Sequence, residues 1–217
     1  MCFTVSRKSI KKYSWTKMRF GIYGGTFSPV HNAHVRAAET FLSECELDKL
    51  LVIPAGIPPH KEMSPKVTAE QRLEMCRLAF SDLPNTEISD IELKRNGKSY
   101  TVMTVRELER DDRELFLLCG TDMMLTFDAW YCFEEIMQKC TLVCIRRESD
   151  KEIEEKLAER LSLYKERYGA KIVLLSVPAL EMSSTEVREA IANGDDTSSM
   201  LPQSILKYVK DNKLYTD

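Results

Sequence analysis

The sequence predicts an α/β fold with a doubly wound, mostly parallel sheet and helices on both faces. Three observations predict it: short apolar runs alternate with longer helix-like segments, the runs are apolar throughout, and glycine, proline, histidine, arginine and hydroxyl residues gather where the runs end. Strands separated by helices are typical of right-handed crossovers between parallel strands. Strands that are apolar at every position suit a sheet covered on both faces.

Six runs are predicted to be strands, and helix-like segments lie between and after them. The strands are 19–23, 50–54, 88–93, 115–119, 141–145 and 172–177. The helices are 32–44, 68–81, 101–110, 150–167, 184–193 and 204–212. No internal repeat, linker or low-complexity segment divides this pattern, so we expect a single domain over residues 18–217. Residues 1–17 contain Lys and Arg but no Asp or Glu, and we expect a disordered extension there.

Composition excludes several classes of protein. The chain has 31 Lys and Arg against 34 Asp and Glu, a near balance that argues against a nucleic-acid-binding or membrane-binding surface. No apolar run approaches the roughly 20 residues of a membrane-spanning helix. The seven cysteines are an odd count without a CxxC motif, which favours reduced core thiols in a cytoplasmic protein. A zinc site at Cys140 and Cys144 is the weaker alternative, because no histidine lies at ligand spacing.

The segment GIYGGTFSPVHNAH is the first candidate site. Gly24 and Gly25 at a strand end let the backbone turn sharply and let a phosphate approach the amides. The next helix presents free N–H groups and the positive end of its dipole to the same place. His31 and His34 share one face of its first turn. Two of the chain's three histidines lie here, which favours a polyanion site over an ordinary strand–helix turn.

Three further cationic or hydroxyl segments follow other strands. Lys61 follows two stiffening prolines in IPAGIPPHK, where phosphate contact and simple solvation are equally good interpretations. Arg147 suits bidentate phosphate binding, although it could also be solvated. MSSTEVREAI predicts a capped helix start at which Ser184, Thr185 and Arg188 form a second anion cradle. Together with the first cradle, this one suggests a polyphosphate held at two helix ends.

Polar and aromatic residues complete the candidate set. Thr101 in ELKRNGKSYT is either a helix cap or a ligand contact. Asp122 follows a buried run and could accept hydrogen bonds from a ribose or help to hold a metal. Trp130 and Tyr131 are either core aromatics or a stacking platform for a planar ring.

These segments resemble the nucleotidylyltransferase superfamily, whose signature is a histidine pair after the first strand, and within it the bacterial nicotinate mononucleotide adenylyltransferases. The resemblance covers residues 19–215 and is carried by GGTFSPVHNAH, IPAGIPPHK, ELKRNGKSYT, GTDMMLTFDAWY, CIRR, MSSTEVR and LPQSILKYVKDNKLY. It implies a Rossmann-like nucleotidylyltransferase domain that transfers the adenylyl group of ATP to nicotinate mononucleotide. The products would be deamido-NAD and pyrophosphate, Mg²⁺ the cofactor, and NAD biosynthesis the pathway.

The resemblance also implies roles by position. Residues implied to bind ATP are Gly24, Gly25, Thr26, Phe27, Asp122, Ser184 and Thr185. Residues implied to be catalytic are His31, His34 and Arg188. Residues implied to hold nicotinate mononucleotide are Lys61, Thr101, Trp130, Tyr131 and Arg147. No side chain is expected to ligate Mg²⁺, which phosphate oxygens and water would hold. A homo-oligomer is compatible with the sequence, which does not decide it.

The expected chemistry needs no protein nucleophile. The mononucleotide phosphate attacks the α-phosphorus of ATP in line, and pyrophosphate leaves. Catalysis then depends on positioning and on stabilising charge on the phosphate oxygens.

The chain departs from the family pattern at two positions. The family usually has GGTFDP, and Ser28 replaces that aspartate; serine before Pro29 would still cap the helix, but the negative charge is lost. Ala33 replaces the glycine of HxGH. The alternatives are adenylyl or cytidylyl transfer to another small phosphorylated acceptor, which SYT and WY disfavour, and an inactive nucleotide-binding regulator, at which only Ser28 hints.

Overall fold

The protein's structure, a computed structural model, describes residues 17–59, 67–146, 150–176 and 182–216. The predicted parallel sheet is confirmed: six parallel strands lie in the order β3-β2-β1-β4-β5-β6. The strands are β1 (Met18–Gly25), β2 (Lys49–Pro54), β3 (Thr86–Ile88), β4 (Arg113–Gly120), β5 (Cys140–Arg146) and β6 (Ile172–Ser176). The chain starts in the middle, winds to one edge, and then returns to wind to the other. A doubly wound sheet of this kind binds ligands beyond the carboxyl ends of its strands, near the switch between β1 and β4.

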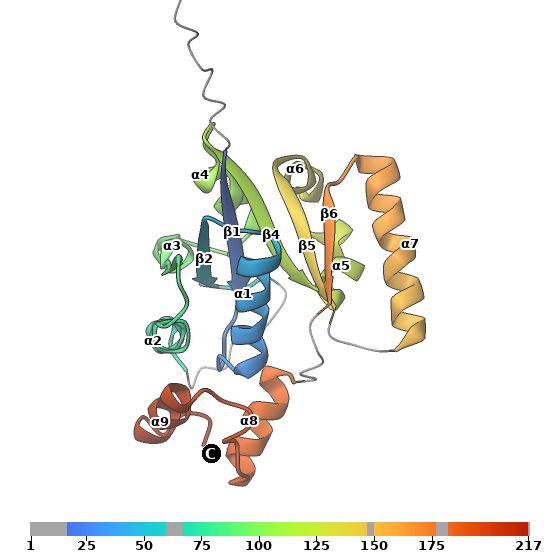
Figure 1. The fold of residues 1–217 in the computed structure, drawn as a ribbon. Coiled ribbons are helices and arrows are strands. Elements are labelled where there is room, and N and C mark those ends of the chain that lie inside the picture. The colour runs from blue at the N-terminus through green and yellow to red at the C-terminus, as the bar shows by residue number, and fades with distance from the viewer. Residues whose placement is uncertain (1–16, 60–66, 147–149, 177–181, 217) are drawn as a thin grey trace, which may run out of the picture.

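Helices cover both faces of the sheet (Figure 1). They are α1 (Asn32–Glu44), α2 (Ala69–Ala79), α3 (Ile91–Lys94), α4 (Thr101–Leu108), α5 (Thr121–Leu125), η1 (Phe127–Ala129), α6 (Phe133–Lys139), α7 (Lys151–Tyr168), α8 (Ser184–Asn193) and α9 (Gln203–Asp211). Successive strand residues point to opposite faces, so Phe116 packs with α1, α2, α8 and α9, whereas Leu117 packs with α4 to α7. Two hydrophobic cores therefore sandwich the sheet.

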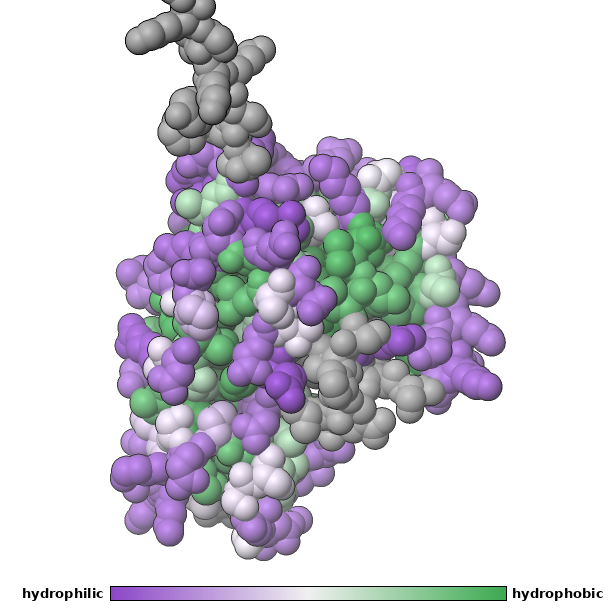
Figure 2. All heavy atoms as spheres, in the orientation of Figure 1, coloured by the Kyte–Doolittle hydropathy of each residue, from purple (hydrophilic) through white to green (hydrophobic). Residues whose placement is uncertain are grey.

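The last two helices close one side of the sheet's carboxyl edge. Figure 1 shows α8 and α9 beyond the ends of the strands, beneath the start of α1. α9 packs against α2, where the Ser204 hydroxyl donates to the Leu78 carbonyl at 3.2 Å. Figure 2 shows polar side chains over the outer surfaces of these helices and an apolar surface beside β5 and β6.

Two predictions of local structure were wrong. The apolar run at 88–93 is not one strand: β3 ends at Ile88, and α3 begins at Ile91. Between them the Ser89 hydroxyl accepts a hydrogen bond from the Ile91 amide at 3.3 Å, which turns the chain out of the sheet. The segment 121–139, predicted without helix, forms α5, η1 and α6. The remaining predicted elements are present with small shifts at their ends, and residue 177 lies outside the described residues.

Buried cysteines behave as the sequence suggested. Cys76, Cys119 and Cys140 are each at most 2% exposed and pack in the two cores. Burial raises the pKa of all three thiols, that of Cys140 to about 12, so they stay protonated and act as small apolar residues. Across the described ranges, no helix is both long and apolar enough to span a membrane. The predicted extension lies, except for Lys17, outside the described residues.

Candidate active site

The loop after β1 is compact and leaves its backbone open beside Gly24. Gly24 and Gly25 are the last residues of β1, and the Gly25 carbonyl accepts a hydrogen bond from the Ala55 amide at 2.8 Å. A side-chain carbon on Gly25 would lie 2.9 Å from the Phe27 ring, so only glycine lets Phe27 fold back here with φ 50°. The same carbon on Gly24 would meet nothing within 4 Å. Phe27 is 1% exposed and its side chain packs in the core, whereas the backbone at Gly24 borders open space.

The two histidines lie together at the start of α1. Their ring centroids are 3.7 Å apart, with 31° between the ring planes. The backbone amide of His31 donates to Nδ1 of His34 at 3.2 Å. Since Nδ1 is the acceptor, a neutral His34 ring carries its proton on Nε2. His31 is 1% exposed and His34 is half-buried.

The predicted cap of this helix was wrong. Neither Ser28 nor Pro29 begins α1, because the chain stays non-helical until His31, which has φ −134° and ψ 171°. His31 therefore occupies the cap position, and Asn32 is the first helical residue. This shift places the histidine pair, rather than Ser28, at the positive end of the helix.

The second predicted helix start has the predicted cap. The Ser183 hydroxyl accepts from the Glu186 amide at 3.2 Å, and the Glu186 carboxylate accepts from the Ser183 amide at 2.6 Å. This capping box is confirmed. These hydrogen bonds lower the pKa of the Glu186 carboxyl below its usual value.

The start of α8 docks onto the loop after β1. The Ser184 hydroxyl donates to the Pro29 carbonyl at 3.2 Å, and Arg188 Nη1 donates to the Ser28 carbonyl at 2.8 Å. Arg188 Nη2 also donates to the Thr185 hydroxyl at 3.0 Å. The structure therefore brings both predicted anion cradles to one place, although 160 residues separate Ser28 from Arg188.

Tyr215 contacts this loop at Ser28, and the sequence did not predict this contact. Its hydroxyl lies 3.1 Å from the hydroxyl of Ser28, and both residues are 8% exposed. Burial raises the pKa of Tyr215 to about 12, while the hydrogen bond with Ser28 and the charges of Arg188 and Arg72 act in the opposite direction. Ser28 is thus the partner of a neutral phenol. The terminal segment belonged to the resemblance, but its sequence offers no signal that Tyr215 reaches this loop.

A second group of predicted residues lies at the start of α4. Thr101 is the first residue of α4, and the ring of the preceding Tyr100 lies 4.9 Å from that of Tyr131. Tyr131 is 57% exposed, as a stacking platform requires. Trp130 instead stacks on the buried ring of Phe127, at 4.8 Å and 26°. One face of Trp130 therefore belongs to the core, and Tyr100 is an aromatic residue that the sequence analysis missed.

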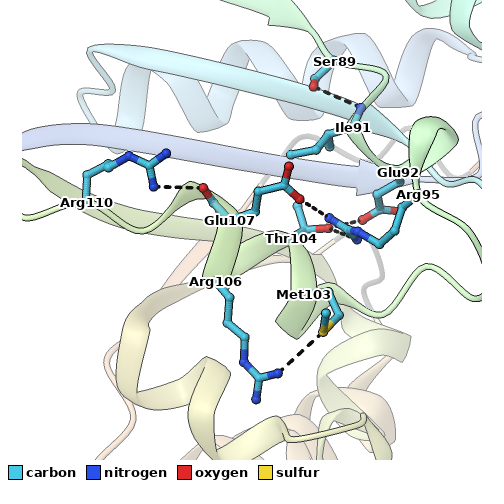
Figure 3. Close-up of polar contacts among 9 residues, drawn as sticks. All are labelled: Ser89, Ile91, Glu92, Arg95, Met103, Thr104, Arg106, Glu107 and Arg110. Carbon is cyan, nitrogen blue, oxygen red and sulfur yellow. Dashed lines mark hydrogen bonds and ion pairs between the residues drawn. The ribbon is translucent and has the colours of Figure 1, made fainter.

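A polar network holds α3 against α4 and so orients this group (Figure 3). The Thr104 hydroxyl donates to the buried Glu92 carboxylate at 2.7 Å. Arg95 donates to the Thr104 hydroxyl at 3.1 Å and to Glu107 at 2.7 Å. The turn between the helices, which ends at Tyr100, is therefore anchored on both sides.

Three predicted residues remain to be placed. Asp122 lies in the first turn of α5, just after β4, and is exposed. Lys61 and Arg147 lie outside the described residues. The described ranges also contain no group of three His, Cys, Asp or Glu side chains that could hold a metal ion. Histidine rings, an arginine and the N–H groups of two helix starts suit a polyphosphate.

The chain is similar in sequence to known proteins. A family model described as cytidylyltransferase-like matches residues 22–190. A probable nicotinate-nucleotide adenylyltransferase from Clostridium botulinum is 35% identical over 201 residues, which cover 92% of this chain and 98% of the relative. A protein of the same name from Geobacter metallireducens is 35% identical over 92% of this chain and 99% of the relative.

Solved structures share the fold at low sequence identity. Plasmodium falciparum nicotinic acid mononucleotide adenylyltransferase, complexed with NaAD, superposes with a TM-score of 0.68 at 18% identity, over 91% of this chain and 97% of that one. A putative nicotinate-nucleotide adenylyltransferase from Vibrio parahaemolyticus gives a TM-score of 0.64 at 17% identity, over 92% and 96%. The family model matches most of the chain, and the two relatives match it over nearly their full length. The chain therefore belongs to the cytidylyltransferase-like family and, within it, to the family of the nicotinate-nucleotide adenylyltransferases.

Proposed function

We propose that this chain transfers the adenylyl group of ATP to nicotinate mononucleotide, forming deamido-NAD (NaAD) and pyrophosphate. The observation that carries the proposal is the docking of α8 onto the loop after β1, which brings Arg188 to the loop that leads into the pair His31/His34. The names of the relatives support the choice of substrates, as does the NaAD complex of the Plasmodium falciparum enzyme.

ATP lies, in this proposal, along the first loop. Its adenosine part follows Gly24, where space is open, and the backbone of Thr26 and Phe27. Its phosphates meet His31, His34 and Arg188, with Ser184 and Thr185 at the end of the triphosphate. Asp122 contacts the ribose and phosphate region from the end of β4.

Nicotinate mononucleotide lies on the other side, at the start of α4. Its ring stacks near Tyr131 and the exposed part of Trp130, beside Thr101. Lys61 and Arg147 neutralise its phosphate. These assignments rest on the resemblance and on the position of the described residues at one edge of the sheet.

The reaction is a direct displacement. An oxygen of the mononucleotide phosphate attacks the α-phosphorus of ATP, the bond to the bridging oxygen breaks, and pyrophosphate leaves with that electron pair. His34 donates from Nε2 to the phosphate oxygens, and Arg188 supplies positive charge as negative charge builds up on the leaving group. The side chains act by holding the two phosphates in line.

Mg²⁺ is the proposed cofactor and would neutralise charge on the polyphosphate. The site's donors fit a metal held by phosphate oxygens and water, because the described residues that gather there are histidines, hydroxyls and an arginine rather than a carboxylate cluster. We also propose a cytoplasmic location, which the buried thiols of Cys76, Cys119 and Cys140 support. A homo-oligomer stays a prediction.

The test is pyrophosphate release from ATP and nicotinate mononucleotide by the wild type and by His34→Ala. Loss of one aligned donor should lower kcat by about 10²–10³-fold while the affinity for ATP changes less. Arg36→Ala is the control on the same helix, because that side chain is exposed and forms a surface ion pair with Glu39. Near-normal turnover of His34→Ala would contradict the proposed role of His34 as a donor to the phosphate oxygens. Pyrophosphate release with another phosphorylated acceptor only would reassign the substrate, and ATP binding without release from any acceptor would indicate a regulator.

A further inference from the structure

Arg72, in α2, is buried against the loops that follow β1 and β2, although nothing in the sequence pattern singled it out. The residue is 1% exposed, and among the described residues its side chain is the largest that is fully buried. Nη1 donates to the Thr26 carbonyl at 3.0 Å, and Nη2 donates to the Gly56 carbonyl at 3.4 Å. Within the described part of the chain, Nε has no hydrogen-bond partner, and no carboxylate forms an ion pair with this guanidinium.

Burying a cation in this position costs desolvation free energy. Desolvation lowers the pKa of Arg72 from its usual value, and two backbone carbonyls are weak compensation for a guanidinium taken out of water. A neutral amide side chain could satisfy one such carbonyl at lower cost. Only the planar guanidinium, with its rigid fork of donors, fixes the distance between two acceptors.

The two carbonyls belong to loops that serve different substrates. Thr26 lies after β1, on the ATP side, and Gly56 lies after the neighbouring strand β2. Gly56 is tied to the acceptor side: its amide donates to the Ser99 hydroxyl at 2.9 Å, and the Ser99 amide donates to the Ile57 carbonyl at 2.8 Å. Ser99 is 7% exposed and immediately precedes Tyr100 and Thr101.

The Gly56 backbone has little room to move. A side-chain carbon on Gly56 would lie 2.5 Å from the Glu92 carbonyl oxygen, so the Gly56 backbone is pressed against α3. Glu92 is itself held by Thr104 at 2.7 Å. A shift of Arg72 would therefore move the Thr26 loop relative to the segment that precedes α4.

We propose that Arg72 is a positioning residue that sets the spacing between two half-sites. The ATP half-site is the loop after β1 with the start of α1, and the acceptor half-site is the start of α4. Arg72 acts only through the backbone of Thr26 and Gly56. The inference rests on the proposed function. Each substrate alone keeps its own contacts when the spacing changes, so its affinity is largely retained. In-line attack needs both phosphates in register, and a misplacement of about 1 Å can cost about 10²-fold in rate.

The experiment compares Arg72→Lys and Arg72→Met with the wild type. Lysine keeps the charge but has a single donor nitrogen instead of the rigid fork of two, and methionine keeps only an apolar side chain of similar length. Arg77→Met is the matched control, since Arg77 lies on the same helix and is exposed. We expect kcat to fall by about 10–10²-fold in Arg72→Lys and further in Arg72→Met, with the KM of each substrate changing by less than about threefold.

Dissociation constants provide a second readout that loss of folded protein would not imitate. NaAD occupies both half-sites and should lose more affinity than ATP or nicotinate mononucleotide measured singly by calorimetry. Ser99→Ala removes the next link and should show the same separation of kcat from KM, which keeps the test decisive if an Arg72 variant does not fold.

The inference is overturned if folded Arg72→Lys retains the wild-type kcat, or if the affinities for both single substrates fall as much as kcat. The proposed function fails separately, when the wild type forms no NaAD. If the wild type uses another acceptor, the same separation of kcat from KM is measured with that acceptor and decides the role of Arg72 there.

Discussion

Ser28 and Tyr215 are 187 positions apart and meet behind the loop after β1. Their hydroxyls share a buried hydrogen bond, and the positive charges of Arg188 and Arg72 act on the Tyr215 phenol. An aspartate at position 28 would bring a negative charge to this spot, whereas serine leaves Arg72 and Arg188 to donate hydrogen bonds to backbone carbonyls. At the scale of single residues, the Ser28 hydroxyl and carbonyl join the loop after β1 to Tyr215 and Arg188 from the end of the chain.

The phenol of Tyr215 should make stability depend on alkaline pH. Its pKa is raised from 10.0 to about 12, so the folded state holds the proton more tightly than the unfolded state. The resulting stabilisation is complete below pH 10 and is lost as the pH rises through about 12. Between pH 9 and 11 the wild type should lose about 1 kcal/mol of unfolding free energy relative to Tyr215→Phe. Urea titrations of both proteins measure this, and parallel pH curves would contradict it.

Among the elements, α3 and α4 show how a buried polar network can orient a binding segment. The Thr104 hydroxyl is 1% exposed and joins Glu92 to Arg95 (Figure 3). Buried polar groups of this kind are costly when one member is removed. The network therefore ties the stability of these two helices to the placement of Tyr100, at the end of the turn between them, and of Thr101, the first residue of α4.

Thr104→Val should destabilise the fold and weaken acceptor binding together. The change leaves the buried Glu92 carboxylate without this donor, which should cost about 2 kcal/mol in unfolding free energy. The KM for nicotinate mononucleotide should rise more than the KM for ATP, as steady-state kinetics with each substrate varied would show. Arg106→Met is the control on the same helix: its bidentate ion pair with the half-buried Glu135 lies outside the Glu92–Thr104–Arg95 network, so its loss should not separate the two KM values. Equal changes in both KM values would contradict the role of the network.

At the scale of the whole molecule, the end of the chain completes the site that the beginning starts. β1 and α1 supply the glycines and histidines, while α8, α9 and the last residues pack onto the same hydrophobic core from beyond the strand ends (Figure 1). Leu214 and Tyr215 are 3% and 8% exposed and belong to that core. Folding of the terminal segment and assembly of the ATP side should therefore be coupled.

Deleting residues 213–217 should lower both stability and activity. Each buried apolar side chain that is lost removes about 1.5–3 kcal/mol of burial free energy, and the support behind Ser28 is lost with Tyr215. Deleting residues 216–217 is the matched control, because it retains Tyr215. Denaturant midpoints and pyrophosphate release measure the two effects. A five-residue deletion that is as stable and active as the two-residue deletion would show that the terminus is dispensable.

The sequence by itself determined the features that depend on neighbouring residues. Periodicity specified the parallel strands and long helices, and the spacing of Ser183 and Glu186 specified the capping box, because each is a property of one short segment. The motif of Gly24, Gly25, His31 and His34 pointed to a polyphosphate site for the same reason. The brief helices after β4 escaped prediction because they lie among core aromatics, and packing rather than local pattern maintains them.

Only the tertiary structure decided which distant residues support the site. Nothing near Arg72 in the chain shows that its guanidinium reaches the carbonyls of Thr26 and Gly56, 46 and 16 positions away. The same holds for Tyr215 behind Ser28 and for Arg188 against the Ser28 carbonyl. These contacts exist because a doubly wound sheet gathers the carboxyl ends of strands from the whole chain at one edge.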